Sequence, residues 1–349
     1  MPTSRTLTRV PQLVAEGFVS PGDAEVLEAV TARYALTISP AMAQLITKGE
    51  AGIAAQFLPR AEELVTLPEE RADPIGDDVH SPLPGLVHRY PDRVLLKVTQ
   101  TCPVYCRFCF RREMVGPTGS AAPMGEAELD AACAYIAANP AIFEVIMTGG
   151  DPLMLSPRRV AALNARLSAI AHVKVLRWHT RVPVVSPERV TEALAQALGS
   201  ADKATYIAIH ANHPAEFTGA AQAALALLHR AGIRLLGQTV LLKGVNAEAD
   251  VLRSLFQTML AHSITPLYLH HPDLAPGTAH FRLSIAEGQK IYSRLRGTLS
   301  GPAIPAYILD IPGGFGKVDI NSPALLVEDA GKTILRDAAG MLHPYLGNQ

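Results

Sequence analysis

The stretch RVLLKVTQTCPVYCRFCFRRE, residues 93–113, carries the strongest signal for both the fold and the chemistry of this chain. Its first seven residues form a short apolar run that predicts a strand. Cys102, Cys106 and Cys109 follow within ten residues of that run, and they are three of the four cysteines in the chain. Three thiols this close together, directly after a strand, predict a metal site or a catalytic site.

The composition of the chain supports metal ligation over disulfide bonding. It has 349 residues, of which 48% are apolar, and a net charge of −1, which gives no bulk electrostatic reason to expect nucleic-acid binding. No apolar run reaches the length of about 20 residues that a membrane span needs, and the N-terminus lacks the apolar core of a secretory signal. We therefore expect a cytoplasmic protein with no membrane or nucleic-acid partner, in which clustered cysteines stay reduced.

Three regions can be distinguished along the chain. Residues 1–80 predict a helical region, because SPGDAEVLEAVTARYA and SPAMAQLITKG each begin with a serine cap and carry apolar residues at helical spacing. The Pro-, Gly- and Asp-rich stretch RADPIGDDVHSPLPG, residues 71–85, spans the boundary to the second region and predicts a connector. Residues 81–320 predict the catalytic region, and residues 321–349 a short C-terminal tail.

The catalytic region alternates between short apolar runs and helical patterns with a period of roughly 30 residues, the size of a strand-plus-helix unit. Six strands are predicted, namely RVLLKVT, EVIMTGG, VLRWHT, ATYIAIHA, RLLGQTVLL and PLYLHH. Helices are predicted between them, for example in GEAELDAACAYIAAN, SPRRVAALNARLSAIA, SPERVTEALAQALG and HPAEFTGAAQAALALLHRAG. This alternation predicts an α/β fold with a parallel sheet, closed or partly closed as a barrel. A doubly wound sheet is the alternative, but no G-x-G-x-x-G follows the first strand.

Polar and glycine residues follow the predicted strands, as in TGGD, HTR, HANH and LHHPD. In a β/α barrel the chemistry takes place at the carboxyl ends of the strands. The cysteine cluster follows the first strand, so it belongs to the same face as these polar segments. The pattern therefore predicts one active site at this face of the sheet.

The spacing of the cysteines favours an iron–sulfur cluster over zinc. Zinc prefers four ligands, usually in two pairs, whereas three thiolates can hold three corners of a four-iron cluster and leave one iron open to a small molecule. Cys133 lies in an apolar helical stretch and is interpreted as a buried structural thiol. The alternative is a non-catalytic zinc-binding module whose site is completed by a distant histidine.

The C-x3-C-x2-C motif, with Phe108 before its last cysteine, resembles the radical S-adenosylmethionine (radical SAM) signature. Longer segments resemble the lysine 2,3-aminomutase family in the same order, over about residues 80–320: HRYPDRVLLKVTQTCPVYCRFCFRR, MTGGDPLML, HTRVPVVSPERVT, IHANHPAEFT, GQTVLLKGVN, LHHPDLAPGTAHFR and YILDIPGGFGK. This resemblance implies a partial (β/α)6 TIM-like barrel of the radical SAM type, preceded by the N-terminal helical region. It also implies an isomerase that moves an amino group between the α and β carbons of an amino acid.

The resemblance further implies three cofactors and a set of residues for each. A [4Fe–4S] cluster is expected on Cys102, Cys106 and Cys109. S-adenosylmethionine is expected against Gly149, Gly150, Asp151, His210 and Gln238. Pyridoxal phosphate is expected as a Schiff base on Lys317, with its phosphate near Arg89 and Arg93. One position departs from the family pattern, because Phe315 replaces a glycine of the run before Lys317.

The substrate is expected to be L-lysine. The resemblance places Arg111 at its carboxylate, by a bidentate pair, and Asp273 and Asp310 at its distal ammonium group. Arginine is the second candidate substrate, since two carboxylates suit any cationic side chain. The short C-terminal region resembles the branch that makes β-lysine for elongation factor P, whereas Asp310 argues against that branch. An external electron donor such as flavodoxin or ferredoxin is implied, and a homo-oligomer is expected.

Overall fold

The computed structural model describes residues 5–115, 124–321, 325–327, 333–337 and 339–347. In this part of the chain, nine strands form one sheet in sequence order, with strands β2 to β8 parallel and the two edge strands antiparallel to their neighbours. The strands are β1 (Leu86–Tyr90), β2 (Arg93–Thr99), β3 (Glu144–Gly149), β4 (Val175–Thr180), β5 (Ala204–His210), β6 (Arg234–Val240), β7 (Ile264–His270), β8 (Ala306–Asp310) and β9 (Lys317–Asp319).

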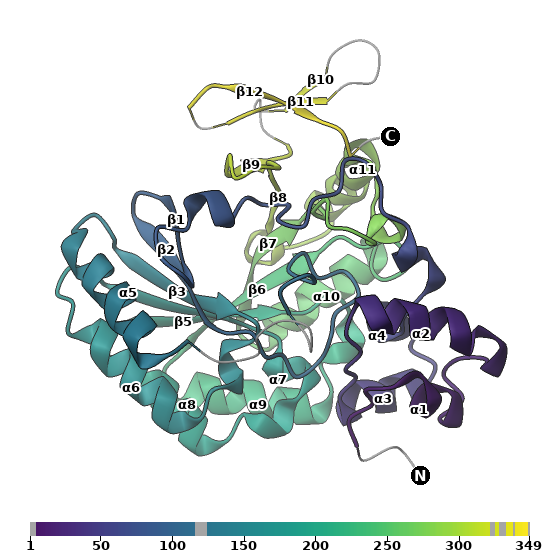
Figure 1. Cartoon of the computed structure of the whole chain (residues 1–349), viewed down its shortest axis with the longest axis horizontal. Coiled ribbons are helices and arrows are strands. Elements are labelled where there is room, and N and C mark those ends of the chain that lie inside the picture. Colours follow the sequence, from purple (N-terminus) through teal and green to yellow (C-terminus); the bar gives the residue numbers. More distant parts are fainter. Residues whose placement is uncertain (1–4, 116–123, 322–324, 328–332, 338, 348–349) are drawn as a thin grey trace.

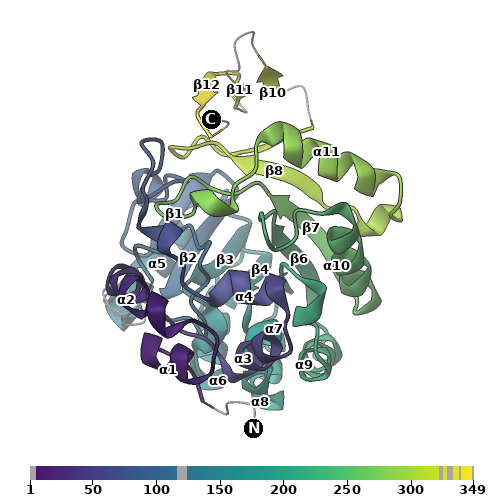
Figure 2. The ribbon, with the colours of Figure 1, turned by 90° about the vertical axis from the view of Figure 1, so that its right-hand side faces the viewer.

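The six predicted strands are confirmed as β2 to β7. Strand β8 adds a seventh parallel strand, and β1 and β9 extend the sheet at its two edges; the sequence analysis assigns none of these three. The sheet is curled, with helices on its outer face (Figures 1 and 2). These helices are α5 (Glu126–Ala138), α6 (Pro157–Ser168), α8 (Glu192–Gly199), α9 (Gly219–Arg230), α10 (Ala249–Ala261) and α11 (Ile285–Arg296).

Two of the predicted helices begin later than expected. The stretches after Ser186 and His213 each start with a short 3-10 turn, Pro187–Arg189 and Pro214–Glu216. The helices α8 and α9 then begin at new caps, where the hydroxyl groups of Thr191 and Thr218 accept hydrogen bonds from the third helical backbone N–H. Proline favours the first turn of a helix, but here the chain bends once more before the helix proper.

The N-terminal segment forms four helices that pack beside the open side of the curled sheet (Figure 2). They are α1 (Val10–Ala15), α2 (Ala24–Arg33), α3 (Pro40–Thr47) and α4 (Ala51–Phe57). Outside this segment, the short helix α7 (Val182–Val185) follows β4. The predicted serine cap at Ser39 is confirmed, since its hydroxyl accepts a hydrogen bond from Met42 N at 3.3 Å. Ser20 instead caps a 3-10 turn, Pro21–Asp23, that leads into α2.

Residues after β9 form a small antiparallel sheet of β10 (Leu325–Val327), β11 (Thr333–Arg336) and β12 (Leu342–Tyr345), separate from the main sheet (Figure 1). The sequence analysis assigns no strands to this region. The boundaries at residues 80/81 and 320/321 stay a prediction. Within the described residues, no helix combines the length and the apolar character that a membrane crossing requires.

Candidate active site

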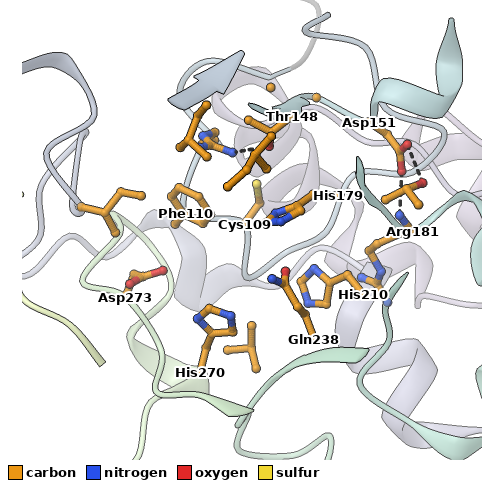
Figure 3. A pocket seen from close by; sticks show the side chains of 18 of the residues that line it. Cys109, Phe110, Thr148, Asp151, His179, Arg181, His210, Gln238, His270 and Asp273 are labelled. Atoms are coloured by element: carbon orange, nitrogen blue, oxygen red, sulfur yellow. Dashed lines mark hydrogen bonds between the residues drawn. The ribbon is translucent and has the colours of Figure 1, made fainter. Parts of the chain in front are cut away.

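All of the predicted site residues line one pocket at the carboxyl ends of the parallel strands. Figure 3 shows Cys109, Thr148, His179 and Gln238 around this pocket, together with Asp273 and His270. The predicted residues that line it are Arg89, Arg93, Cys102, Cys106, Cys109, Arg111, Gly149, Gly150, Asp151, His210, Gln238, Asp273, Asp310 and Lys317. Cys133 in α5 does not line the pocket, and it is half-buried and not buried as predicted, because it lies beside the buried Ala132 on a helix whose other face is exposed.

The three clustered cysteines lie in the loop after β2, where each is half-buried. Burial and nearby negative charge raise the pKa of Cys102, and burial together with the neighbouring thiol raises the pKa of Cys109 to about 11. The Cys106 Sγ atom accepts a hydrogen bond from Arg181 Nη1 at 3.0 Å, which partly offsets the effect of burial on its pKa. Three adjacent thiols of this kind become thiolates together only when a cation binds them.

An iron–sulfur cluster fits this arrangement. Among the described residues, no group of three or more His, Cys, Asp or Glu side chains could hold a metal ion. In a four-iron cluster each cysteine thiolate binds a different iron, so three cysteines would lie around a body larger than one ion and leave one iron without a protein ligand. The three thiols also face an open pocket, which a cluster with one accessible iron requires.

A buried ion-pair network connects the N-terminal segment to the cysteine loop. Glu63 is fully buried and accepts hydrogen bonds from Arg107 Nε at 2.9 and 3.0 Å and from Arg112 Nη2. Arg107 also donates to the carbonyl of Ala35 at 2.7 Å, and Arg112 to that of Gly277 at 3.0 Å. Because Arg107 and Arg112 flank Cys109, Glu63 fixes the backbone that carries the thiols.

Replacing Glu63 by glutamine is expected to destabilise this loop. Removing one partner of a buried ion pair leaves an uncompensated charge, which costs about 3–5 kcal/mol. We expect Glu63→Gln to lower the free energy of unfolding by that order in urea titrations, and to reduce the iron retained after anaerobic desalting. Glu62→Gln is the matched control, because Glu62 is the exposed neighbour. Equal stability of the two variants would contradict the proposed function of the network.

The glycine turn after β3 packs directly against the backbone that leads into Cys102. Gly149 has a φ of +113°, and a Cβ atom there would lie 2.2 Å from the carbonyl oxygen of Thr99. A Cβ on Gly150 would lie 2.5 Å from the carbonyl oxygen of Thr101. Glycine is therefore required at both positions for the β3 turn to lie beside the cysteine loop.

Asp151 ends this turn and is buried. Its Oδ1 accepts hydrogen bonds from Leu153 N at 3.0 Å and from the Thr180 hydroxyl at 2.7 Å. Its Oδ2 accepts hydrogen bonds from Val182 N at 3.2 Å and from Arg181 N at 2.7 Å; Figure 3 shows Asp151 beside Arg181. Burial raises the pKa of Asp151, and these donors oppose that effect. Through these four hydrogen bonds Asp151 joins the ends of β3 and β4, and its expected contact with S-adenosylmethionine stays a prediction.

His210 and Gln238 are neighbours at the ends of β5 and β6, where they pair in the parallel register. Among the described residues, His210 Nε2 and His179 Nε2 are buried nitrogen atoms without a hydrogen-bond partner. Burial lowers the pKa of both imidazoles, and the positive charges of Arg181 and Arg177, respectively, add to the effect. Two neutral rings with an unused nitrogen, in a pocket beside Gln238, fit a polar organic ligand such as S-adenosylmethionine.

Lys317 and Asp310 face each other because β8 and β9 pair antiparallel, with these two residues in register. The Lys317 Nζ atom lies 2.6 Å from both carboxylate oxygens of Asp310. Arg89 Nη1 lies 3.6 Å from Asp310, and the backbone N–H of Lys317 donates to the Tyr90 hydroxyl at 3.0 Å. A primary amine in the pocket, with an arginine beside it, fits a phosphorylated aldehyde such as pyridoxal phosphate.

Arg93 lies at the edge of the pocket. Its guanidinium stacks over the Tyr90 ring at 3.8 Å and forms an ion pair of 2.6 Å with the exposed Asp92. Phe315, in the turn before Lys317, stacks on His343 of β12 with ring centroids 3.9 Å apart. The departure from the family pattern at this position therefore joins the lysine turn to the C-terminal sheet.

Asp273 follows β7 and faces the same side of the pocket as Asp310. Burial and the negative charge of Asp310 raise the pKa of Asp273 to about 8. Burial and the positive charge of Lys317 lower the pKa of His270 to about 4, so this neighbouring ring is neutral near pH 7. The two carboxyl groups thus form an acidic end of the pocket that favours a cation.

Several residues that shape the site are not identified by the sequence analysis, chiefly Asp77, Glu63, Arg181 and His179. Arg181 and His179 belong to the quoted segment HTR, and their position at a strand end is a usable signal. Asp77 lies in the stretch interpreted as a connector, and Glu63 in a short 3-10 helix, Ala61–Leu64. Neither has a local sequence signal, since both are buried by contacts with distant residues.

Known proteins are similar to this chain in sequence. The family described as the radical SAM superfamily matches residues 96–255, and the one described as lysine-2,3-aminomutase matches residues 292–348. The L-lysine 2,3-aminomutase of Fusobacterium nucleatum is 37% identical over 83% of this chain and 68% of its own length. That of Acetoanaerobium sticklandii is 39% identical over 83% and 69%, and that of Escherichia coli 36% identical over 76% and 77%. Identity at this level over most of both chains means that this chain belongs to the radical SAM lysine 2,3-aminomutase family, a family of isomerases.

Proposed function

We propose that this protein interconverts L-lysine and β-lysine with a [4Fe–4S] cluster, S-adenosylmethionine and pyridoxal phosphate. The observation that carries the proposal is the pair Asp273 and Asp310 on one pocket with Lys317, Arg111 and the three cysteines. A pocket with an arginine and two carboxylates is complementary to an amino acid with a second, distal ammonium group.

The cofactors, when bound, supply the electron, the hydrogen-abstracting radical and the amine-carrying π system that moving an amino group between neighbouring carbons requires. Cys102, Cys106 and Cys109 would hold the iron. His210, Gln238 and the Gly149–Gly150 backbone would bind S-adenosylmethionine, and Lys317 would bind pyridoxal phosphate with Arg89 and Arg93 near its phosphate.

The chain itself orients the substrate. The guanidinium of Arg111 would bind the carboxylate of lysine as a bidentate partner, and Asp273 and Asp310 would bind its ε-ammonium group. Binding both ends of lysine would fix the position of its α and β carbons in the pocket. Positioning of this kind is a main source of rate enhancement.

The lining of the pocket would limit the access of water to the reacting atoms. Its apolar wall comes from the strands and from the cysteine loop, and it includes Val87, Val94, Val104, Phe108, Phe110 and Ile146. A dry wall of this kind protects a reactive radical from solvent and strengthens the charged contacts at the two ends of the substrate.

The assay that tests the proposal is anaerobic conversion of L-lysine to β-lysine with dithionite, S-adenosylmethionine and pyridoxal phosphate. We expect lysine to be converted and arginine to be a poorer substrate. Conversion of arginine alone would replace the proposed substrate but keep the chemistry. Colourless, zinc-containing protein from anaerobic purification, with no conversion of either amino acid, would contradict the proposal.

The acid pair gives a specific prediction. Asp273→Asn and Asp310→Asn keep the size of the side chain but remove a charge-assisted hydrogen bond worth about 1.5–3 kcal/mol, so each should lower kcat/KM for lysine by at least about tenfold when measured above pH 8, where Asp273 is ionised. The exposed Asp202→Asn is the matched control. Near-normal turnover in both variants would mean that the pocket does not recognise lysine by its ammonium group.

The raised pKa of Asp273 also predicts a pH dependence. Below a pKa of about 8 this carboxyl group carries a proton, and only the ionised form attracts the ammonium group. In the wild type kcat/KM for lysine should therefore rise with pH up to this range, and the rise should disappear in Asp273→Asn. A pH profile that is the same in both proteins would contradict this assignment.

We also propose that the protein uses a flavodoxin- or ferredoxin-type electron donor, forms a homo-oligomer and is located in the cytoplasm.

A further inference from the structure

Asp77 lies in the connector between the N-terminal helices and β1, and its side chain is buried behind the pocket. Its backbone N–H donates to Asp73 Oδ1 at 2.9 Å, and that of Asp78 donates to Asp73 Oδ2 at 2.8 Å. The adjacent Gly76 contacts the turn before Lys317, since a Cβ atom on Gly76 would lie 2.5 Å from Gly314 N. The connector is therefore a built part of the site that holds Asp77 in a fixed place.

Three cations converge on the carboxylate of Asp77. Its Oδ1 lies 3.1 Å from Arg89 Nη2. Its Oδ2 lies 2.9 Å from Arg111 Nη2 and 3.2 Å from Lys97 Nζ. The two oxygens thus bind the arginine proposed for the cofactor phosphate and the arginine proposed for the substrate carboxylate.

The hydrogen bonds of Arg111 show what this contact does. Both Nε, at 3.2 Å, and Nη2 donate to Asp77, and Nη1 donates to the hydroxyl of Thr148 at 3.1 Å. A guanidinium has five N–H donors, so two remain, which is the number that a bidentate carboxylate accepts. The Phe110 ring, 4.6 Å from the guanidinium carbon, supports the same orientation.

The charges around Asp77 also favour anionic ligands, because three cations face one carboxylate. Burial alone would raise the pKa of Asp77, but Arg111 and Lys97 outweigh it and hold the pKa at about 2, so the group is ionised throughout the working range. One anion among Arg89, Lys97 and Arg111 offsets part of their positive charge. The remaining positive charge is directed at the pocket, which Arg89 and Arg111 line.

We propose that Asp77 is a positioning residue that orients Arg111 for the substrate carboxylate and Arg89 for the cofactor phosphate. This inference rests on the proposed function for the identity of the two ligands. Its new content is that one carboxylate, that of Asp77, contacts both the arginine at the substrate end and the arginine at the cofactor end of the site. A purely structural acid would stabilise the connector without changing either affinity.

The first test compares Asp77→Asn with Asp78→Asn, its exposed neighbour, as the matched control. Losing a charge-assisted contact should raise the KM of Asp77→Asn for lysine by about tenfold, with a smaller change in kcat. The dissociation constant of pyridoxal phosphate, titrated by absorbance into cofactor-free protein, should rise severalfold, while iron content stays at the wild-type level. Unchanged KM and cofactor affinity in Asp77→Asn would overturn the inference.

A double-mutant cycle separates positioning from other effects. If Asp77 acts through Arg111, then the double variant Asp77→Asn with Arg111→Lys should lose no more kcat/KM than the more damaging single variant. Losses that add would mean that Asp77 acts elsewhere. Should Asp77→Asn fail to fold, Asp77→Glu decides the question. It keeps the charge on a longer arm, so an intermediate KM supports positioning and wild-type values of both constants contradict it.

The two proposals fail in different ways. Wild-type protein that does not convert lysine would remove the proposed function. The cofactor titration needs no turnover, so it still reports whether Asp77 controls the affinity of Arg89 for a phosphate. Conversely, lysine turnover in the wild type with an unaltered Asp77→Asn would leave the function and remove the positioning residue.

Discussion

Alanine at any one of Cys102, Cys106 or Cys109 is expected to remove the intact iron–sulfur cluster and all detectable cleavage of S-adenosylmethionine. Each thiol is one of only three protein ligands of the proposed cluster, and burial raises the pKa of each, so two remaining thiols have neither the number nor the charge to hold four irons. Iron and sulfide quantitation, with electron paramagnetic resonance on anaerobic protein, measures the loss.

Cys133→Ala is the matched control for these variants. Cys133 is half-buried in α5, on the outer face of the sheet, and does not line the pocket. We expect it to keep both the iron and the cleavage of S-adenosylmethionine. Full iron loss in Cys133→Ala, or full iron retention in one of the other three, would mean that the ligands are wrongly assigned.

Lys317→Ala is expected to abolish the visible absorbance of bound pyridoxal phosphate while leaving the iron content intact. The substitution removes the one amine that the β8–β9 pairing brings into the pocket beside Asp310 and Arg89, whereas the cysteines lie in a separate loop after β2. Absorbance spectra and iron analysis of the same sample separate the two effects.

Borohydride reduction and peptide mass spectrometry identify the cofactor lysine directly. The pyridoxyl group should be found on Lys317 in the wild type. Lys97, which forms an ion pair with Asp77, and the exposed Lys243 should stay unmodified. A pyridoxyl group on Lys97 or Lys243 would overturn the assignment of Lys317.

Strands β2 to β7 could be predicted because each is short, apolar and followed by glycine or polar residues, as in residues 144–151. The sequence analysis assigns neither β8, which lies within the parallel part of the sheet, nor the edge strands β1 and β9. Strand β9 has only three residues after a glycine-rich turn, Lys317–Asp319, and its pairing with β8 is a tertiary contact that no local pattern indicates.

The site divides in the same way. The spacing of the three cysteines predicts an iron–sulfur cluster, and the resemblance to the family implies the roles of Lys317 and Arg111. Asp77 stands in a stretch whose Pro, Gly and Asp content predicts an exposed connector. Asp77 is buried because it forms ion pairs with Arg89, Lys97 and Arg111. These contacts form only on folding, so the sequence does not show that this stretch is part of the site.

The pairing of β8 with β9 has a consequence for how this enzyme can evolve or be redesigned. Asp310 contacts Lys317 directly, so a mutation that changes the substrate at Asp310 also changes the environment of the cofactor amine. Asp273 stands on a different loop, after β7, and has no hydrogen bond to Lys317 among the contacts described. Under the proposed function, a change of side-chain specificity is therefore most accessible through Asp273, because Asp310 would contact both the Lys317 amine and the ammonium group of the substrate.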